Sequence, residues 1–250
     1  MYKLTPLTQK QVQQRLLIIW SEIEKVFHDA GVRYFLSFGS LLGAVRHQGF
    51  IPWDDDLDVH IHQDDYQMAL SALDKNLPDG LQLVTASVDM SWDIDFRVVD
   101  LKTRLNSEES LDSATGLCID FFAVERCHPN MGYWHALYKK LKHQQERNQV
   151  RASLVTKSLL YGLRLLLVVR GCFSKKAHWF VNDKLQPTTF TDEELWPLES
   201  RLFENRPCFV PAQPERFLQA WYGDDFMTPL PESQRKGHFS KCFYMEPSNP

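Results

Sequence analysis

Apolar residues recur every three or four positions through the first 30 residues of the chain. Between residues 8 and 30 they stand at Val12, Leu16, Ile19, Ile23, Val26 and Phe27. This spacing predicts one apolar face of a helix, and Gly31 is typical of the residue that follows a helix end. The run 32–38 is mostly apolar and predicts a strand that leads into Gly39 and Ser40.

Apolar and polar residues alternate between residues 56 and 61. Leu57, Val59 and Ile61 would share one face of a strand, and Asp56, Asp58 and His60 the other. We also expect helices at 40–45 and 64–77, and strands at 81–86, 96–101 and 116–124. This mixture predicts an α+β fold, in which helices flank a mixed β-sheet core.

The character of the sequence changes near residue 128. Residues 128–184 form long helical patterns, first basic and then apolar, and predict a helical insertion. Residues 185–250 are mixed and hold most of the chain's 13 prolines, so we expect them to wrap the surface. We therefore divide the chain into a catalytic core (1–127), the insertion (128–184), and a C-terminal segment (185–250) that completes the same domain.

Composition excludes several broad classes of function. The 250-residue chain has a net charge of −4 and a pI of about 6.1, which gives no basic field for nucleic acid. Its five cysteines form no Cys-x-x-Cys pair, so we expect buried thiols in a reducing cytoplasm, with neither disulfides nor zinc. The first residues lack the apolar run of a signal peptide, and no uncharged run of about 18 residues predicts a membrane span.

Four carboxylates between residues 54 and 58 are the main candidates for chemistry. Like charges this close together repel one another unless a cation lies among them. Asp56 and Asp58 would share a strand face, so we expect them to bind Mg²⁺, with Mn²⁺ as a substitute. Upstream, Gly39 allows close backbone approach and Ser40 begins a predicted helix, an arrangement that favours a bound phosphate.

A Gly-Ser turn, a short helix and a strand with Asp-x-Asp form the nucleotidyltransferase arrangement, which usually needs a third carboxylate on a neighbouring strand. Asp120 is our candidate, because an ionised carboxylate in an apolar strand needs a counter-charge such as a metal. The alternatives are a solvated acidic loop for residues 54–58 and a buried, paired carboxylate for Asp120. A second Asp-x-Asp, formed by Asp93 and Asp95, lacks the upstream Gly-Ser turn, and we interpret it as structural.

Residues 38–59 resemble the signature of the LicD/fukutin family of phosphotransferases almost without a break. The stretch reads Phe-Gly-Ser-Leu-Leu-Gly-Ala-Val-Arg-His-Gln-Gly-Phe-Ile-Pro-Trp-Asp-Asp-Asp-Leu-Asp-Val. Weaker blocks at 96–103, 116–125 and 222–238 follow in the family's order. Ala123 and Glu125 depart from the Pro and Asp that the family usually has there.

This resemblance implies a nucleotidyltransferase-like fold and transfer of a phospho-alcohol to a sugar of a bacterial surface glycan or glycolipid. The implied donor is most often CDP-choline, and CDP-ribitol in fukutin-type relatives. Asp56, Asp58 and Asp120 would then hold Mg²⁺ at the diphosphate, Asp120 would accept the acceptor's proton, and Gly39 and Ser40 would cradle the phosphates. The alternatives are transfer of another phospho-alcohol or phospho-sugar, and a catalytically dead binding module.

Four further residues are candidates for substrate binding. Arg46 and His47 precede the acidic loop and are expected to contact phosphate or acceptor. Their alternatives are a salt bridge from Arg46 to the start of the acidic loop and a surface position for His47. We expect Trp53 to stack on the nucleobase or close the pocket, and His238 to reach the site from the tail. Their alternatives are packing under the loop and a surface position.

Basic and strongly apolar residues adjoin in the insertion. Residues 139–157 are rich in Lys and Arg, and residues 159–170 are mostly Leu and Val. Such a pair of helices can lie on an anionic membrane, as a peripheral contact through residues 154–173. The alternative that we favour is a helical hairpin that caps the core with its apolar side buried. The sequence sets no oligomeric state.

Overall fold

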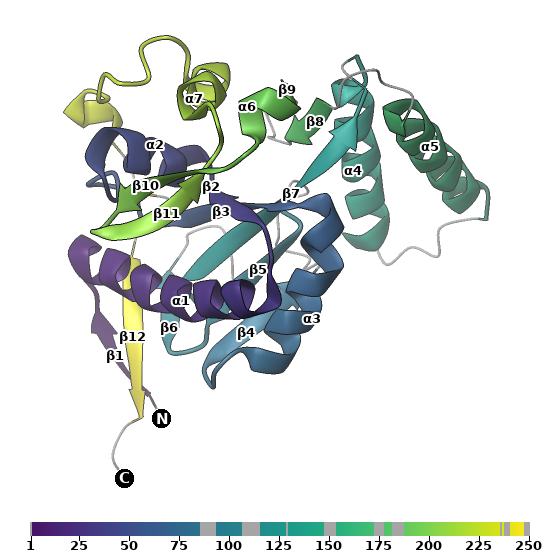
Figure 1. Ribbon diagram of the computed structural model, residues 1–250. Coiled ribbons are helices and arrows are strands. Elements are labelled where there is room, and N and C mark those ends of the chain that lie inside the picture. The colour runs from purple at the N-terminus through teal and green to yellow at the C-terminus, as the bar shows by residue number, and fades with distance from the viewer. Residues whose placement is uncertain are drawn as a thin grey trace.

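Helices cover a central mixed β-sheet in the computed structural model of the protein (Figure 1). The structure describes residues 2–85, 94–106, 116–128, 130–147, 154–172, 178–181, 188–235, 237 and 241–247. This architecture confirms the α+β class that the sequence predicts.

Three sheets are present in the described part of the chain. The main sheet runs β2 (Tyr34–Leu36), β3 (Leu57–His62), β7 (Cys118–Cys127), β5 (Phe96–Asp100) and β4 (Leu81–Thr85), and β8 (His178–Val181) and β9 (Thr188–Thr191) extend it from β7. A second sheet joins β1 (Tyr2–Pro6), β12 (Lys241–Pro247) and β6 (Thr103–Asn106), and a hairpin joins β10 (Glu199–Phe203) and β11 (Arg206–Val210). β3 and β7 are parallel, and the other pairs are antiparallel.

The helices lie around the main sheet (Figure 1). They are α1 (Gln9–Ala30), α2 (Phe38–His47), α3 (Tyr66–Asn76), α4 (Gly132–Arg147), α5 (Leu154–Cys172), α6 (Asp192–Leu195) and α7 (Pro214–Tyr222), with 3₁₀ turns at η1 (Gln63–Asp65) and η2 (Glu232–Gln234). α1 runs along one face of the sheet, α2 and α7 lie together, and α4 and α5 project beyond the end of β7.

The first helix follows from local signals in the sequence. Thr8 caps it through a capping box with Gln11, and Gly31 ends it in the left-handed conformation at φ 72°. Its buried face packs against the sheet, where the Phe27 ring lies 5.6 Å from that of Phe121. The helix predicted over residues 8–30 is therefore confirmed.

The boundary between the first predicted strand and helix is different in the structure. β2 covers only three residues, Ser37 is the N-cap residue, and α2 already begins at Phe38. Gly39 and Ser40 therefore lie inside the first turn of α2, not in a turn before it. The backbone N–H groups of a first turn have no partner within the helix, so this position is suited to an anion.

The C-terminal segment contributes to the same hydrophobic core as the N-terminal residues. Phe217 of α7 is fully buried, stacks on Phe190 at 4.8 Å and meets Phe35 of β2 at 5.9 Å. β12 pairs with β1, which brings the two ends of the chain together (Figure 1). The segment therefore supplies strands and core residues, more than the surface wrapping that we expected.

The insertion is helical over α4 and α5, but its end is not. Residues 178–181 form β8, which pairs with β7, so the helical prediction is wrong there. Leu167 of α5 is buried, whereas most apolar side chains of this helix are exposed. The expected burial of the apolar side therefore holds for little of α5. Within the described residues, no helix is long and apolar enough to cross a membrane.

Candidate active site

Three side chains from neighbouring strands meet on one face of the main sheet. Asp58 of β3 is the register partner of Asp120 on β7, and Asp120 is the register partner of Arg97 on β5. Partners directly opposite in a ladder point to the same face. The sheet therefore places two carboxylates and a guanidinium side by side.

Arg97 holds Asp120 through two hydrogen bonds. Its Nε donates to Oδ1 of Asp120 at 2.9 Å, and its Nη2 donates to Oδ2 at 3.0 Å. The two side chains are 20% and 18% exposed, so water screens this pair only in part. Asp120 thus has the counter-charge that an apolar strand demands, and a protein side chain supplies it.

Ser40 fixes the backbone of Asp58. Its buried Oγ accepts a hydrogen bond from the Asp58 N–H at 2.9 Å, and the Ser37 N–H donates to the Asp58 carbonyl at 3.0 Å. Gly39 lets the backbone of α2 approach the acidic loop closely, because a Cβ at this position would lie 2.8 Å from Oδ2 of Asp54. These contacts show how the two residues shape the site; their contact with phosphate stays a prediction.

The acidic loop is more buried than a solvated loop would be. Asp54 and Asp55 are buried, and Gln13 of α1 donates to the Asp54 carbonyl at 2.9 Å. Burial, the charge and hydrogen bond of Asp56, and the charge of Asp55 raise the pKa of Asp54 to about 8. Asp54 therefore holds its proton to a higher pH than an exposed carboxyl group does, which relieves part of the repulsion in the cluster.

Of the three carboxylates predicted to bind metal, two lie opposite each other on adjacent strands and the third precedes one of these strands. Asp58 and Asp120 are register partners, while Asp56 precedes β3 and interacts with Asp54. In the described part of the chain, no three His, Cys, Asp or Glu side chains form a ready-made metal site. Mg²⁺ usually takes one or two carboxylates and completes its shell with water and substrate phosphates. The oxygen donors of Asp58 and Asp120 fit that requirement.

Arg46 and His47 connect α2 to the C-terminal segment. Nη1 of Arg46 donates to the Phe226 carbonyl at 2.7 Å, and its Nε donates to Nε2 of His47 at 3.0 Å. Burial and the charge of Arg46 lower the pKa of His47, so this imidazole stays neutral. The structure therefore gives Arg46 a carbonyl partner in the C-terminal segment. Contact of Arg46 and His47 with phosphate or acceptor stays a prediction.

The C-terminal segment also reaches the acidic loop. The guanidinium of Arg235 lies 4.6 Å from the centre of the Trp53 ring, a cation–π contact. Gly237 lies against Asp55, since a Cβ there would meet Oδ2 of that residue at 2.5 Å. Trp53 therefore contacts the tail, and its stacking on a nucleobase stays a prediction. His238 lies outside the described residues.

Two other carboxylates have structural partners. Asp95 is held by the Ala123 N–H at 2.7 Å and by Nζ of Lys139 at 2.8 Å. Asp100 is fully buried and makes two hydrogen bonds with Arg15 of α1, at 2.6 and 3.0 Å. The structural interpretation of the second Asp-x-Asp is confirmed for Asp95, while Asp93 lies outside the described residues.

Comparison with known protein families matches residues 31–213 to the family described as LicD/FKTN/FKRP, nucleotidyltransferase domain. The chain belongs to this family. The match includes β2, α2, the acidic loop, β3, β5 and β7, so every strand that carries the three-residue site lies within it. The membership that residues 38–59 predict is confirmed.

Individual relatives match the chain to very different extents. The lipopolysaccharide cholinephosphotransferase LicD of Haemophilus influenzae is 56% identical over 254 residues, covering 88% of this chain and 93% of that protein. The ribitol 5-phosphate transferase FKRP of Homo sapiens is 58% identical over 40 residues, covering 16% of this chain and 8% of that protein. An uncharacterized protein of Rickettsia prowazekii is 45% identical over 65 residues, covering 25% of this chain and 23% of that protein.

Sequence reasoning missed Arg97 as a member of the site. Its signal was present, because a charged residue stands between Phe96 and Val98 in an apolar strand. Gln13 was missed too, since it lies on a helix far from the loop in sequence. Neither residue has a spacing that ties it to the Asp-x-Asp motif; only the register of β5 and the position of α1 do so.

Proposed function

We propose that this chain transfers phosphocholine from CDP-choline to a sugar hydroxyl of a bacterial surface glycan, such as a lipopolysaccharide. One observation carries the proposal: 56% identity to the lipopolysaccharide cholinephosphotransferase of Haemophilus influenzae, along nearly the full length of both chains. The site geometry supports it, because paired carboxylates beside a helix N-terminus suit a diphosphate donor.

The reaction is a phosphoryl transfer in which positioning and charge neutralisation dominate. The acceptor hydroxyl oxygen forms a bond to the phosphorus that carries choline. The bond from this phosphorus to the bridging oxygen of the diphosphate breaks, and CMP leaves with that oxygen. The hydroxyl proton passes to a carboxylate. Asp120 is our candidate acceptor for this proton, as the family resemblance implies.

Asp58 and Asp120 would hold Mg²⁺, or Mn²⁺ in its place, with Asp56 as a further donor. The ion would neutralise charge on the diphosphate and on the leaving group. Arg97 would hold the Asp120 carboxylate in place through its two hydrogen bonds and supply a counter-charge beside it. The first-turn N–H groups at Gly39 and Ser40 would bind donor phosphate oxygens.

Transfer of another phospho-alcohol is the second candidate. The ribitol 5-phosphate transferase FKRP supports it, but over 40 residues only. A binding module without activity is a third, and the presence of Asp56, Asp58 and Asp120 argues against it, because such a module has no need of three carboxylates that repel one another. Donor choice depends on the shape of the pocket, so an experiment with different donors separates the candidates.

A thermal-shift panel tests the donor directly. The purified chain is melted with CDP-choline, CDP-ribitol or CDP-glycerol, each with and without Mg²⁺. A ligand at 100 times its Kd adds about 2.7 kcal/mol, which raises the melting temperature of a chain of this size by about 5–10 °C. We expect the largest Mg²⁺-dependent shift with CDP-choline. A larger shift with CDP-ribitol supports the second candidate, and no shift with any donor contradicts the proposal.

Turnover is measured as CMP release with lipopolysaccharide as acceptor. Asp58→Asn should lower the rate by at least about a hundredfold, because it removes a carboxylate ligand of the proposed cation. The matched control is Asp29→Asn, which changes an exposed carboxylate near the end of α1 and should leave the rate unchanged. Full activity in Asp58→Asn would show that the ligands are chosen wrongly.

A further inference from the structure

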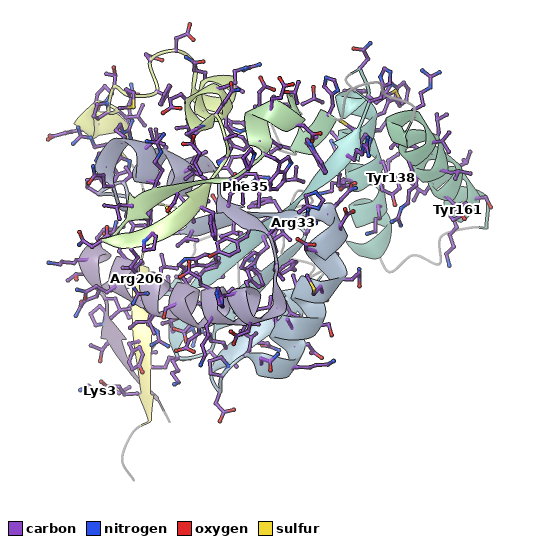
Figure 2. The ribbon with its side chains drawn as sticks, in the orientation of Figure 1. Lys3, Arg33, Phe35, Tyr138, Tyr161 and Arg206 are labelled. Carbon is purple, nitrogen blue, oxygen red and sulfur yellow. The ribbon has the colours of Figure 1, made fainter. Side chains whose placement is uncertain are left out.

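Helix α5 turns apolar side chains toward solvent. Six of its large apolar residues are at least 42% exposed: Leu159, Tyr161, Leu165, Leu166, Val168 and Val169. Figure 2 shows Tyr161 on the side of α5 that faces away from the sheet. Leu167, by contrast, is buried. A helix on the surface of a globular domain normally has the opposite polarity, with its apolar stripe facing the core.

The charged residues of α5 avoid this outer face. Successive helix positions are rotated by about 100°, so the six exposed apolar residues, with Ser158 and Gly162, cover about half of the circumference opposite Leu167. Lys157, Arg164 and Arg170 all lie within about 80° of Leu167, on both sides of it. The outer face is therefore apolar and has a basic border on each side.

The surrounding segment is strongly basic as a whole. Residues 131–180 contain ten Lys and Arg and a single acidic residue, Glu146, although the complete chain has a net charge of −4. Seven of these ten basic residues lie on α4 and α5, and the chain outside residues 131–180 is acidic. This asymmetry makes the surface complementary to a negatively charged partner and repulsive to a second copy of itself.

We propose that the outer face of α5 binds an anionic lipid bilayer, with the helix lying in the plane of the interface. The apolar side chains would enter the boundary between headgroups and acyl chains, and the flanking Lys and Arg would reach the headgroup phosphates. The alternatives are pairing of α5 with α5 of a second copy and an apolar protein partner. Charge favours the bilayer over the first, because both copies would bring the same basic borders.

Docking at α5 leaves the candidate active site open. α4 is fixed to the far end of β7, where Nζ of Lys139 lies 3.3 Å from Oε1 of Glu125. Asp120 lies near the other end of this strand, and α4 and α5 project away from it (Figure 1). The proposal depends only on α5 and its charges, so its test does not depend on which donor the active site uses.

Vesicle flotation of the complete chain tests the proposal. Neutral vesicles contain phosphatidylcholine alone, and anionic vesicles contain phosphatidylcholine with phosphatidylglycerol. The unmodified chain should float with anionic vesicles. The variant Leu165→Gln, Leu166→Gln, Val169→Gln should lower the partition coefficient by at least about tenfold, because it removes apolar area from the interface. Arg164→Gln with Arg170→Gln should lower it by about 30-fold on anionic vesicles, at about 1 kcal/mol per basic residue.

A matched control changes exposed apolar residues elsewhere. Ile18→Gln, Met68→Gln and Leu202→Gln remove the same kind of side chain from α1, α3 and β10, and should leave flotation unchanged. Circular dichroism and melting temperature confirm that each variant is folded, and the charge variant keeps the test decisive if the apolar one does not fold. Equal flotation of the unmodified chain and both α5 variants overturns the proposal. The proposal is also overturned if the unmodified chain does not float and instead forms a dimer in sedimentation velocity that only the α5 variants dissociate.

Discussion

Replacing Arg97 by methionine removes the guanidinium that neutralises Asp120 and keeps an unbranched side chain that fills the space of the arginine's aliphatic part. Two hydrogen bonds of ordinary length, 2.9 and 3.0 Å, join the pair, and the two side chains are only 20% and 18% exposed. The substitution leaves a carboxylate beside Asp58, its register partner, without its neighbouring positive charge. We expect the variant to fold with lower stability.

The size of the loss follows from the burial of the pair. Breaking a fully buried ion pair by removing one partner costs about 3–5 kcal/mol, while an exposed pair is worth about 0–1 kcal/mol. Partial exposure places Arg97→Met between these limits, at about 2 kcal/mol. For a chain of 250 residues this lowers the melting temperature by about 4–8 °C. Calorimetry in the absence of Mg²⁺ measures this change in melting temperature.

A double-mutant cycle provides the control. Asp120→Asn combined with Arg97→Met should be less destabilised than the sum of the single variants, by about 1 kcal/mol or more, because the unpaired charge is gone. Mg²⁺ should raise the melting temperature of Arg97→Met more than that of the unmodified chain, since a cation can replace the guanidinium. An unchanged melting temperature in Arg97→Met, or an additive cycle, would refute the reasoning.

Three further changes test other parts of the structure. Gly39→Ala should lower the free energy of unfolding by about 1–2 kcal/mol, measured in urea, because its methyl group displaces the buried Asp54 carboxylate. Lys139→Met should lower it by about 3 kcal/mol in the same assay, because Asp95 loses its buried positive partner. Burial and a neighbouring arginine lower the pKa of His62, so only the unfolded chain takes up this proton below about pH 6.5, and stability falls as the pH falls. Between pH 7.5 and 5.5, His62→Gln should lose less stability than the unmodified chain, by up to about 1.4 kcal/mol in urea titrations. An equal loss in both proteins would contradict the neutral state of that imidazole.

The sequence pattern predicts α1 and β3 well, because interactions within each segment determine where these elements begin and end. The capping box at Thr8 and the left-handed Gly31 act within one or two turns of α1, so its bounds were predicted almost to the residue. The alternation of Leu57, Val59 and Ile61 predicted the buried face of β3. It also placed Asp58 on the other face, where its register partner Asp120 lies.

Contacts between distant segments were beyond these patterns. β1 pairs with β12 across almost the whole chain, and no local signal in either segment indicates the other. The β10–β11 hairpin turns through Glu204 and Asn205, both with positive φ, at 51° and 62°. Asparagine is common in such a turn but glutamate is not, so the sequence lacked the usual Asn-Gly signal.

The site itself shows the same division between local and distant information. Residues 38–59 carry the Gly-Ser pair and the acidic loop in one continuous signature, and this was sufficient to identify the family. Arg97 comes from another strand, and the tail residue Arg235 from the far end of the chain. A residue of this kind enters the site through the register of a sheet or the path of the tail, so only the folded structure reveals it.

Strand β7 runs from the candidate active site toward the helices α4 and α5, which carry the proposed membrane-binding surface. Asp120 and Glu125 are five positions apart on β7, about 17 Å at 3.3 Å per residue. The buried Lys139 forms ion pairs with both Glu125 and Asp95, and these pairs attach α4 to the end of β7. A bilayer at α5 would therefore be held at a fixed distance from the carboxylates. An acceptor sugar anchored in that bilayer would have to extend away from the bilayer surface to reach these carboxylates. A chain of sugars on a lipid extends in this way, whereas a bare lipid headgroup does not.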